Sequence, residues 1–348
     1  MSLVRCSWTD QGFGVYEIDI LPTGPQWSPS SKEADGYLVP GFIDIHIHGA
    51  QGIDFMSADS QRMDQLCTYL KAKGYEGFLP TTVTAPLSEV ESAVFNLIEH
   101  DMVLGFHLEG PFISPKHPGA QPEDWIRPPN EGIRDWRSVL EHPRLKVVTF
   151  APEEPGGNEL ASMLSQRGVI PSLGHSDATY DQATMAANHG VRHATHTYNA
   201  MRGLHHREPG CVGFVMTSPK PFYAELVYDR HHVSRPAADA LVRCVGQDWL
   251  IAVSDSSAAT GMADGVELSM WGHECVVSEG TVRLASNGAL AGSAVTLLEC
   301  FKNLAEDFSW ELAVHACSLN PRKALGLSTP PKVWVDLDSS WNLRTVFS

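Results

Sequence analysis

The feature that most constrains the fold of this chain is a regular alternation of two kinds of segment from residue 39 onward. Eight short runs of apolar, β-branched or aromatic residues alternate with longer segments in which apolar residues recur at helical spacing. Because parallel strands need crossover connections, usually helices, this alternation predicts a closed parallel barrel of the α/β class. The expected strands are residues 42–46, 77–83, 103–108, 145–150, 169–173, 191–195, 222–228 and 250–254. The expected helices include residues 59–73, 87–100, 159–167, 180–189, 236–245 and 293–307.

The two ends of the chain have a different pattern. Residues 1–38 read as short strands interrupted by prolines and a glycine, and residues 330–337 again have the character of a strand. We expect these ends to pair into a small β domain beside the barrel. The predicted organisation is a barrel of residues 39–327 and a β domain assembled from residues 1–38 and 328–348.

Charge and composition narrow the class of partner. The chain has 41 acidic and 25 basic residues, a formal net charge of −16, whereas nucleic acids and anionic membranes attract basic surfaces. We therefore expect no nucleic acid and no membrane as partner. No run approaches the roughly 20 apolar residues of a membrane-spanning helix, and the first ten residues lack the apolar core of a secretory signal. Seven scattered cysteines without a CxxC pair indicate reduced thiols in a cytoplasmic protein.

Histidine and acidic residues recur where the expected barrel strands finish, which is where catalytic residues lie in such barrels. His46 and His48 are two apart, so both point to the same side of the first strand. Four more candidates follow the third, fifth, sixth and eighth strands: Glu109, His175, His196 and Asp255. Imidazole and carboxylate ligands together suit zinc or iron, as a single ion or a bridged pair. The sequence thus predicts a metal site at the mouth of the barrel.

Other histidines are assigned differently. His193 is three residues before His196 and faces the opposite side of its strand, so we expect a structural role. His107 shares a strand face with Glu109, and both a supporting role beside the metal and simple packing in the barrel remain open.

These residues and their neighbours resemble the amidohydrolase superfamily, and within it the branch that deacetylates N-acetylated amino-sugar phosphates. The matching segments occur in order along most of the chain from residue 40. They are PGFIDIHIHG (40–49), HLEGPFISPK (107–116), GHS (174–176), THTYNAM (195–201), REPG (207–210), a DxxHV segment (229–233), VSD (253–255), LAGSAVTL (290–297) and NPRKALGL (320–327). The HLEGPF, HxYNAM and REPG elements are particular to the deacetylase branch, which makes the resemblance more specific than HxH alone.

The resemblance implies a TIM-like (β/α)8 barrel of the amidohydrolase type, with a small β-sandwich built from both chain termini. It implies that Glu109, His175 and His196 hold the principal metal ion. His46 and His48, with Asp255, would hold a second ion where one is bound. Zinc is the expected metal, with iron or manganese as alternatives. Asp255 would also serve as the general base of amide hydrolysis.

The resemblance further implies which residues meet the substrate. The implied contact residues are Ala120, Gln121, Asn199, Ala200, Arg207, His232, Leu290, Ala291 and Gly292. Arg207 would bind the phosphate from the neighbouring subunit, which implies a homodimer, and residues 290–292 would close over the substrate. A guanidinium can bind a phosphate through two parallel hydrogen bonds despite the negative net charge.

One position departs from the deacetylase pattern. The family usually has KGAH after HLEGPF, and its histidine contacts the substrate near the amide, whereas this chain has Gln121 there. Glutamine donates a neutral hydrogen bond only, and His117 is an alternative occupant of the same space. The implied reaction is deacetylation of N-acetyl-D-glucosamine 6-phosphate. Deacetylation of N-acetylgalactosamine 6-phosphate or another N-acyl amine, and a non-catalytic barrel, are the alternatives.

Overall fold

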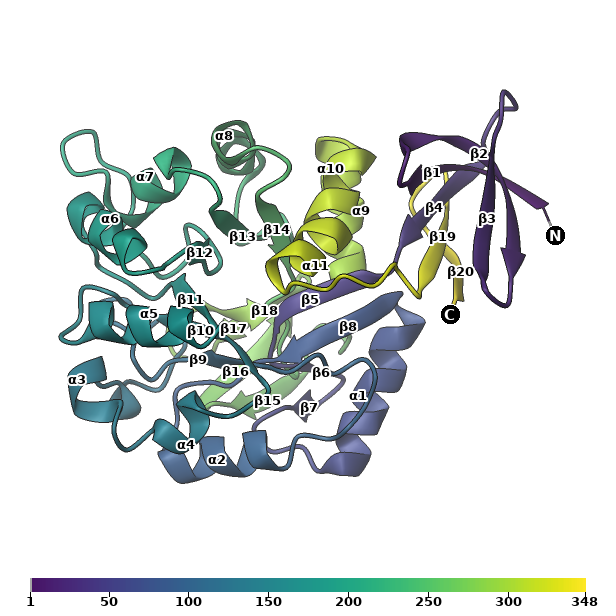
Figure 1. The fold of residues 1–348 in the computed structure, drawn as a ribbon. Coiled ribbons are helices and arrows are strands. Elements are labelled where there is room, and N and C mark those ends of the chain that lie inside the picture. Colours follow the sequence, from purple (N-terminus) through teal and green to yellow (C-terminus); the bar gives the residue numbers. More distant parts are fainter. Residues whose placement is uncertain (1) are drawn as a thin grey trace.

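The computed structural model describes residues 2–348, so Met1 of the expected N-terminal segment lies outside the described residues. Eight short parallel strands form the wall of the barrel (Figure 1). Six belong to one sheet in the order β14-β13-β12-β11-β10-β9, and β5 pairs in parallel with β8. Their bounds are β5 Phe42–Ile47, β8 Tyr75–Pro80, β9 Phe106–Glu109, β10 Leu145–Phe150, β11 Ile170–Leu173, β12 His193–Ala194, β13 Tyr223–Val227 and β14 Leu250–Val253.

Isolated parallel bridges continue the strand order across both gaps between the two sheets. Ile47, at the end of β5, bridges to Ser256, just after β14, and Thr81, just after β8, bridges to His107 of β9. A cluster of buried aliphatic side chains from five of these strands fills the interior: Ile43, Ile45, Leu79, Val147, Val227, Ile251 and Val253. The TIM-like α/β fold expected from the sequence is confirmed.

Helices cover the outside of the barrel. The main ones are α1 Ser60–Ala72, α2 Leu87–Phe95, α5 Gly157–Gln166, α6 Tyr180–Asn188, α7 Gly210–Thr217, α8 Arg235–Val245 and α9 Leu297–Asp307. α9 begins four residues later than expected because a capping box between Thr296 and Glu299 fixes its first turn. α7 was not predicted: its residues are apolar on all sides and mostly buried, so no amphipathic pattern marks it. Shorter helical segments are α3 Pro129–Gly132, α4 Arg137–Leu140, α10 Trp310–Val314 and α11 Asn320–Ala324.

A four-stranded antiparallel sheet, which the sequence pattern did not predict, is inserted between β14 and α9. Its strands are β15 Glu267–Met270, β16 His273–Ser278, β17 Thr281–Leu284 and β18 Leu290–Ser293, in that spatial order. It has its own small hydrophobic core. Ser293, at the end of β18, bridges to Ser256, so the insert lies against the chain just beyond the eighth barrel strand.

Both chain ends meet in one six-stranded sheet of order β20-β19-β4-β1-β2-β3, beside the barrel (Figure 1). Its strands are β1 Ser2–Thr9, β2 Gly12–Leu21, β3 Gly24–Pro29, β4 Gly36–Pro40, β19 Trp334–Asp338 and β20 Leu343–Phe347. The indole rings of Trp27 and Trp334 lie 4.7 Å apart although three strands separate β3 from β19, so the sheet is strongly curled. The buried Arg5 ties the ends together by donating to Asp336 (Nε–Oδ1 2.6 Å).

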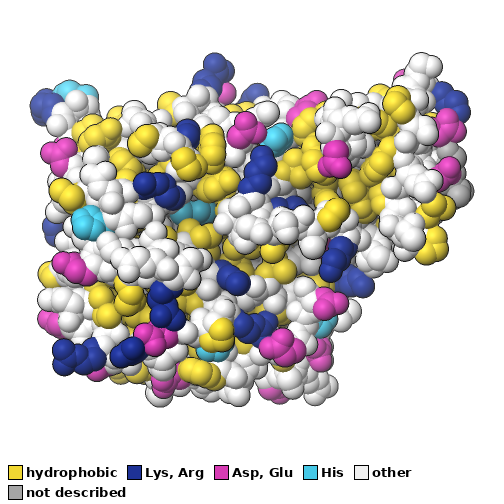
Figure 2. All heavy atoms as spheres, in the orientation of Figure 1, with side chains coloured by type: hydrophobic (Ala, Val, Ile, Leu, Met, Phe, Trp, Pro, Cys, Tyr) yellow, Lys and Arg dark blue, Asp and Glu magenta, His cyan; other side chains and the backbone are white. Residues whose placement is uncertain are grey.

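The surface carries charges of both signs. On the face drawn in Figure 2, Lys and Arg side chains alternate with Asp and Glu and do not gather in one basic patch. Within residues 2–348, every helix is too short or too polar to cross a membrane. All seven cysteines are free thiols, and five are buried, in line with the expected reduced state.

Candidate metal centre and active site

The three predicted principal ligands converge although they come from three different strands. The carboxylate Oε1 of Glu109, the last residue of β9, lies 3.1 Å from Nε2 of His175 and 3.1 Å from Nε2 of His196. The two Nε2 atoms are themselves 3.1 Å apart. All three residues are buried. Three ligand atoms at mutual distances near 3 Å can face one metal ion.

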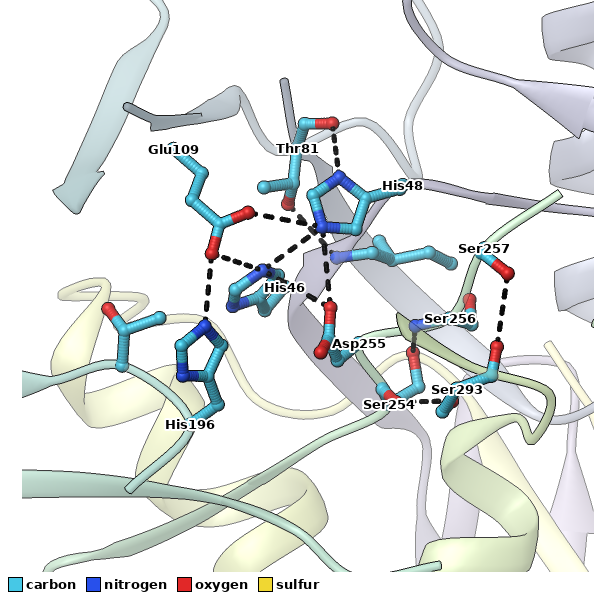
Figure 3. A network of polar contacts seen from close by, with 12 residues as sticks. His46, His48, Thr81, Glu109, His196, Ser254, Asp255, Ser256, Ser257 and Ser293 are labelled. Carbon is cyan, nitrogen blue, oxygen red and sulfur yellow. Dashed lines mark hydrogen bonds and ion pairs between the residues drawn. The ribbon is translucent and has the colours of Figure 1, made fainter. Parts of the chain in front are cut away.

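A second group of ligand atoms adjoins the first through the same carboxylate (Figure 3). Nε2 of His48 lies 3.3 Å from Glu109 Oε2, and Nε2 of His46 lies 3.4 Å from Oε1. Asp255 Oδ1 is 3.3 Å from His48 Nε2 and 3.5 Å from His46 Nε2. Glu109 therefore takes part in both groups, as a bridging ligand would.

Three of the four histidines are oriented by a hydrogen bond at Nδ1, the ring nitrogen that points away from the ligand groups. Nδ1 of His46 faces Glu225 Oε2 at 3.3 Å, Nδ1 of His48 faces the carbonyl of Thr81 at 3.1 Å, and Nδ1 of His175 faces the carbonyl of His117 at 2.9 Å. These acceptors each require a proton on Nδ1, which leaves the Nε2 lone pairs directed at the centre.

This orientation fits a bound cation. With Nδ1 protonated, the neutral rings of His46 and His48 present two acceptor Nε2 atoms 3.3 Å apart, which repel one another unless a proton or a cation lies between them. A divalent metal satisfies all of these lone pairs together with the Glu109 carboxylate, and a mixed nitrogen and oxygen set is typical of zinc and related metals. The residues present thus fit the predicted metal.

The ionisation of the two acidic residues, Glu109 and Asp255, also indicates a bound cation. Burial would raise the pKa of Glu109, but in the absence of a metal the positive charge of a protonated His46 and hydrogen bonds from His175 and His196 hold that pKa well below its usual value. Burial would also raise the pKa of Asp255, but the charge of His46 and a hydrogen bond donated by His48 lower that pKa instead. Two buried carboxylates remain ionised, and they need protons on the imidazoles or a metal cation in place of those protons.

The backbone is strained where the ligand strands end. His175, His196 and Asp255 have positive φ values of 46°, 28° and 49°, a region that residues other than glycine rarely adopt. Each such conformation costs on the order of 1–3 kcal/mol, and strain of this kind clusters at functional sites because the surrounding structure has to impose it.

Sequence reasoning missed one buried carboxylate that organises this centre. Glu225 lies in the middle of β13 and is fully buried. Its oxygens contact Nδ1 of His46 and Nε2 of His193 (2.9 Å), and Oε2 accepts the backbone N–H of His196 (3.1 Å). The available signal was an acidic residue inside an otherwise apolar strand, which is rare without a buried partner.

His193 and His107 belong to neither group of ligand atoms. His193 binds Glu225 and offers no atom to either ligand group, which agrees with the expected structural role. His107 uses both ring nitrogens, on the carbonyl of Ile45 (3.0 Å) and on Thr149 Oγ1 (2.7 Å). Burial lowers the pKa of His107 to about 3. Of its two open readings, the structure favours a neutral, packed barrel histidine.

A small cavity of about 170 Å³ lies directly over the ligand groups. Seven of the nine predicted substrate contacts line it: Ala120, Gln121, Asn199, Ala200, His232, Leu290 and Gly292. Ala291 is buried and does not line the cavity, and Arg207 lies outside the cavity, exposed, with Nη1 2.8 Å from Nε2 of its neighbour His206. The structure thus brings all the predicted contacts except these two to the cavity wall.

Two residues of the wall are held in defined orientations. Gln121 donates from Nε2 to Glu109 Oε2 (2.7 Å) and accepts the backbone N–H of Thr84 at Oε1 (2.6 Å). The side chain of His117, the alternative occupant of this space, faces Asp177 instead (3.3 Å). His232 donates from Nδ1 to Asp229 (2.7 Å), which leaves its Nε2 for the cavity.

Comparison with known proteins establishes the family. The sequence profile described as "Amidohydrolase family" matches residues 37–330, most of the chain. The chain belongs to the amidohydrolase family. This amidohydrolase is 38% identical over 333 residues to an N-acetylglucosamine-6-phosphate deacetylase of Bacillus subtilis, covering 91% of this chain and 83% of that protein. It is 37% identical to an N-acetylgalactosamine-6-phosphate deacetylase of Escherichia coli O157:H7, covering 86% and 81%.

A solved structure resembles this amidohydrolase over almost its whole length. It is a mutant of the N-acetyl-D-glucosamine-6-phosphate deacetylase from Mycobacterium smegmatis in complex with N-acetyl-D-glucosamine-6-phosphate. The TM-score is 0.88 at 27% identity, covering 99% of this chain and 97% of the other.

Proposed function

We propose that this amidohydrolase hydrolyses the acetamide of N-acetyl-D-glucosamine 6-phosphate, which releases acetate and D-glucosamine 6-phosphate. The observation that carries the proposal is the convergence of four histidines, Glu109 and Asp255 beneath a small cavity. The relatives named as deacetylases of amino-sugar phosphates supply the substrate class.

The proposed cofactor is one or two divalent ions, with zinc first and iron or manganese as alternatives. Glu109, His175 and His196 would hold the principal ion, and His46 and His48 with Asp255 a second one. When bound, such a metal supplies Lewis acidity, which makes water nucleophilic at neutral pH and polarises a carbonyl group.

Asp255 would move the proton. Its carboxylate is ionised in the folded protein and lies on the cavity wall, so it can accept a proton from the attacking water. The same group would then deliver that proton to the leaving nitrogen. Gln121 has one amide N–H committed to Glu109, and its second N–H would be available to the developing oxyanion.

The sugar phosphate would lie against Asn199, the backbone of Ala200 and His232, beneath residues 290–292. The phosphate would meet Arg207 of a neighbouring subunit, which makes the working form a homodimer, in the cytoplasm. The exposed position of Arg207, outside the cavity of its own chain, supports this arrangement.

We also propose that the curled terminal sheet is a β-sandwich domain of residues 1–38 and 328–348, distinct from the barrel domain of residues 39–327. Its separate hydrophobic cluster of Tyr16, Ile18, Leu38 and Trp334 supports the division.

A second candidate substrate is the epimer N-acetylgalactosamine 6-phosphate. It is favoured by Gln121 at the usual histidine position and by the relative from Escherichia coli O157:H7. Parallel measurement of kcat/KM for the two epimers with zinc, iron or manganese supplied decides between them. We expect the glucosamine compound to be preferred; the reverse preference would replace our assignment, and turnover of neither would refute it.

A further inference from the structure

A second, larger cavity adjoins the one over the metal centre. Its volume is about 700 Å³, against about 170 Å³ for the inner cavity. The two share three lining residues, Gly119, Gln121 and Trp271. These residues therefore form the partition between the metal centre and the outer cavity.

Trp271 is the large member of this partition and is held firmly. It occupies the two-residue turn between β15 and β16, where Trp271 and Gly272 have φ of 54° and 81°. Positive φ at both positions is typical of a type I′ turn, which disfavours a bulky first residue. The indole Nε1 donates to Asp54 Oδ2 (2.9 Å), and the ring lies edge-on to His48 with centroids 5.0 Å apart. These tertiary contacts offset the strain.

The substrate's orientation follows from the proposed function, on which this inference rests. Asn199, Ala200 and His232 line the inner cavity and not the outer one. They would hold the sugar, which is attached to the nitrogen of the amide. The acyl substituent lies on the opposite side of the carbonyl carbon. It would therefore extend toward the partition, where the indole of Trp271 lines both cavities and would contact an acetyl methyl group.

We infer that Trp271 is the residue that limits the substrate's acyl group to acetyl. Without the indole, the inner cavity would open into the outer one, whose wall includes the apolar side chains of Met56, Val83 and Trp125. Linear uncharged acyl chains would then fit. The acidic side chains of Glu89, Glu123 and Asp124 also line the outer cavity and would disfavour an acyl chain that ends in a carboxylate.

The test compares kcat/KM for N-acetyl-, N-butyryl-, N-hexanoyl- and N-succinyl-glucosamine 6-phosphate in zinc-loaded wild type, Trp271→Ala and Trp271→Phe. We expect Trp271→Ala to raise the hexanoyl-to-acetyl ratio by about 10–100-fold, Trp271→Phe to raise it less, and succinyl to stay poor in all three proteins. Phe95→Ala, which removes an exposed ring outside both cavities, should leave the ratio unchanged. An unchanged ratio in both folded Trp271 variants would overturn the inference.

A binding measurement separates this inference from the proposed function. Acetate and hexanoate resemble the acyl product and can bind the zinc-loaded protein whatever sugar it uses. Calorimetry should show hexanoate binding that is at least about tenfold tighter in Trp271→Ala than in wild type, with acetate little changed. If wild type turns over neither sugar phosphate, the proposed function fails, and this titration alone decides the role of Trp271. Equal hexanoate affinity in the two proteins would refute that role.

Discussion

Nδ1 of His46 lies 3.3 Å from Oε2 of Glu225, and both side chains are fully buried. The other oxygen of the same carboxylate faces His193, and Oε2 also accepts the backbone N–H of His196. The side chain of Glu225, in β13, thus holds the ring of His46, a predicted metal ligand in β5. It also holds the backbone of His196, a predicted metal ligand just after β12. A carboxylate behind a metal-binding histidine sets the ring's orientation and tautomer.

Replacing Glu225 with Gln should therefore weaken metal binding. The amide keeps the shape but supplies only one acceptor oxygen where three donors converge, so zinc affinity should fall by about 10–100-fold. Competition with a chromogenic chelator measures this affinity directly. Glu76→Gln is the matched control, since Glu76 pairs with Arg322, away from the metal centre, and should bind zinc normally. Equal affinity in the two variants would contradict the role given to Glu225.

Replacing Asp255 with Asn should separate metal binding from turnover. Glu109, His175 and His196 remain in place, so the principal ion should still bind, while loss of the proton acceptor should lower kcat by roughly 10²–10⁴-fold. Metal content and steady-state kinetics on one preparation give both quantities. Near-normal turnover in this variant would remove Asp255 from the mechanism.

Replacing Arg207 with Ala should affect phosphorylated substrates selectively. Loss of a charge-assisted contact is expected to reduce kcat/KM for the sugar phosphate by about 10–100-fold and to spare N-acetylglucosamine itself. Equal losses on both compounds would dismiss Arg207 as the phosphate ligand.

The intersubunit position of Arg207 has its own test. Refolded mixtures of Arg207→Ala and Asp255→Asn subunits would contain dimers with one site that has both residues intact. Such mixtures should be more active than either variant alone. If each site used the arginine of its own chain, mixing would restore nothing.

The sequence predicted those parts of the molecule that depend on local periodicity. His46 and His48 were identified because a strand places residues i and i+2 on one face, and Glu109, His175, His196 and Asp255 because parallel strands end at one rim of a barrel. The helices α1, α5, α6 and α8 were found within one or two residues because their apolar residues recur on one face.

Features that depend on contacts between distant segments were not predicted. Glu225 gains its role only from histidines 29 or more residues away in the chain, and its strand reads as apolar. The strands β15–β18 are four to six residues long and pack a core of their own, so they leave a weak pattern. Trp271 became a wall residue only through its contacts with Asp54 and His48.

The proposed function requires that Glu109, His175 and His196 bind one metal ion at the barrel mouth. Anomalous diffraction at the zinc absorption edge, from crystals of the zinc-loaded protein, tests it most directly. We expect a strong peak about 2.0–2.3 Å from a carboxylate oxygen of Glu109 and from Nε2 of both histidines. A peak away from these three atoms, or its absence in protein shown to be active, would contradict it.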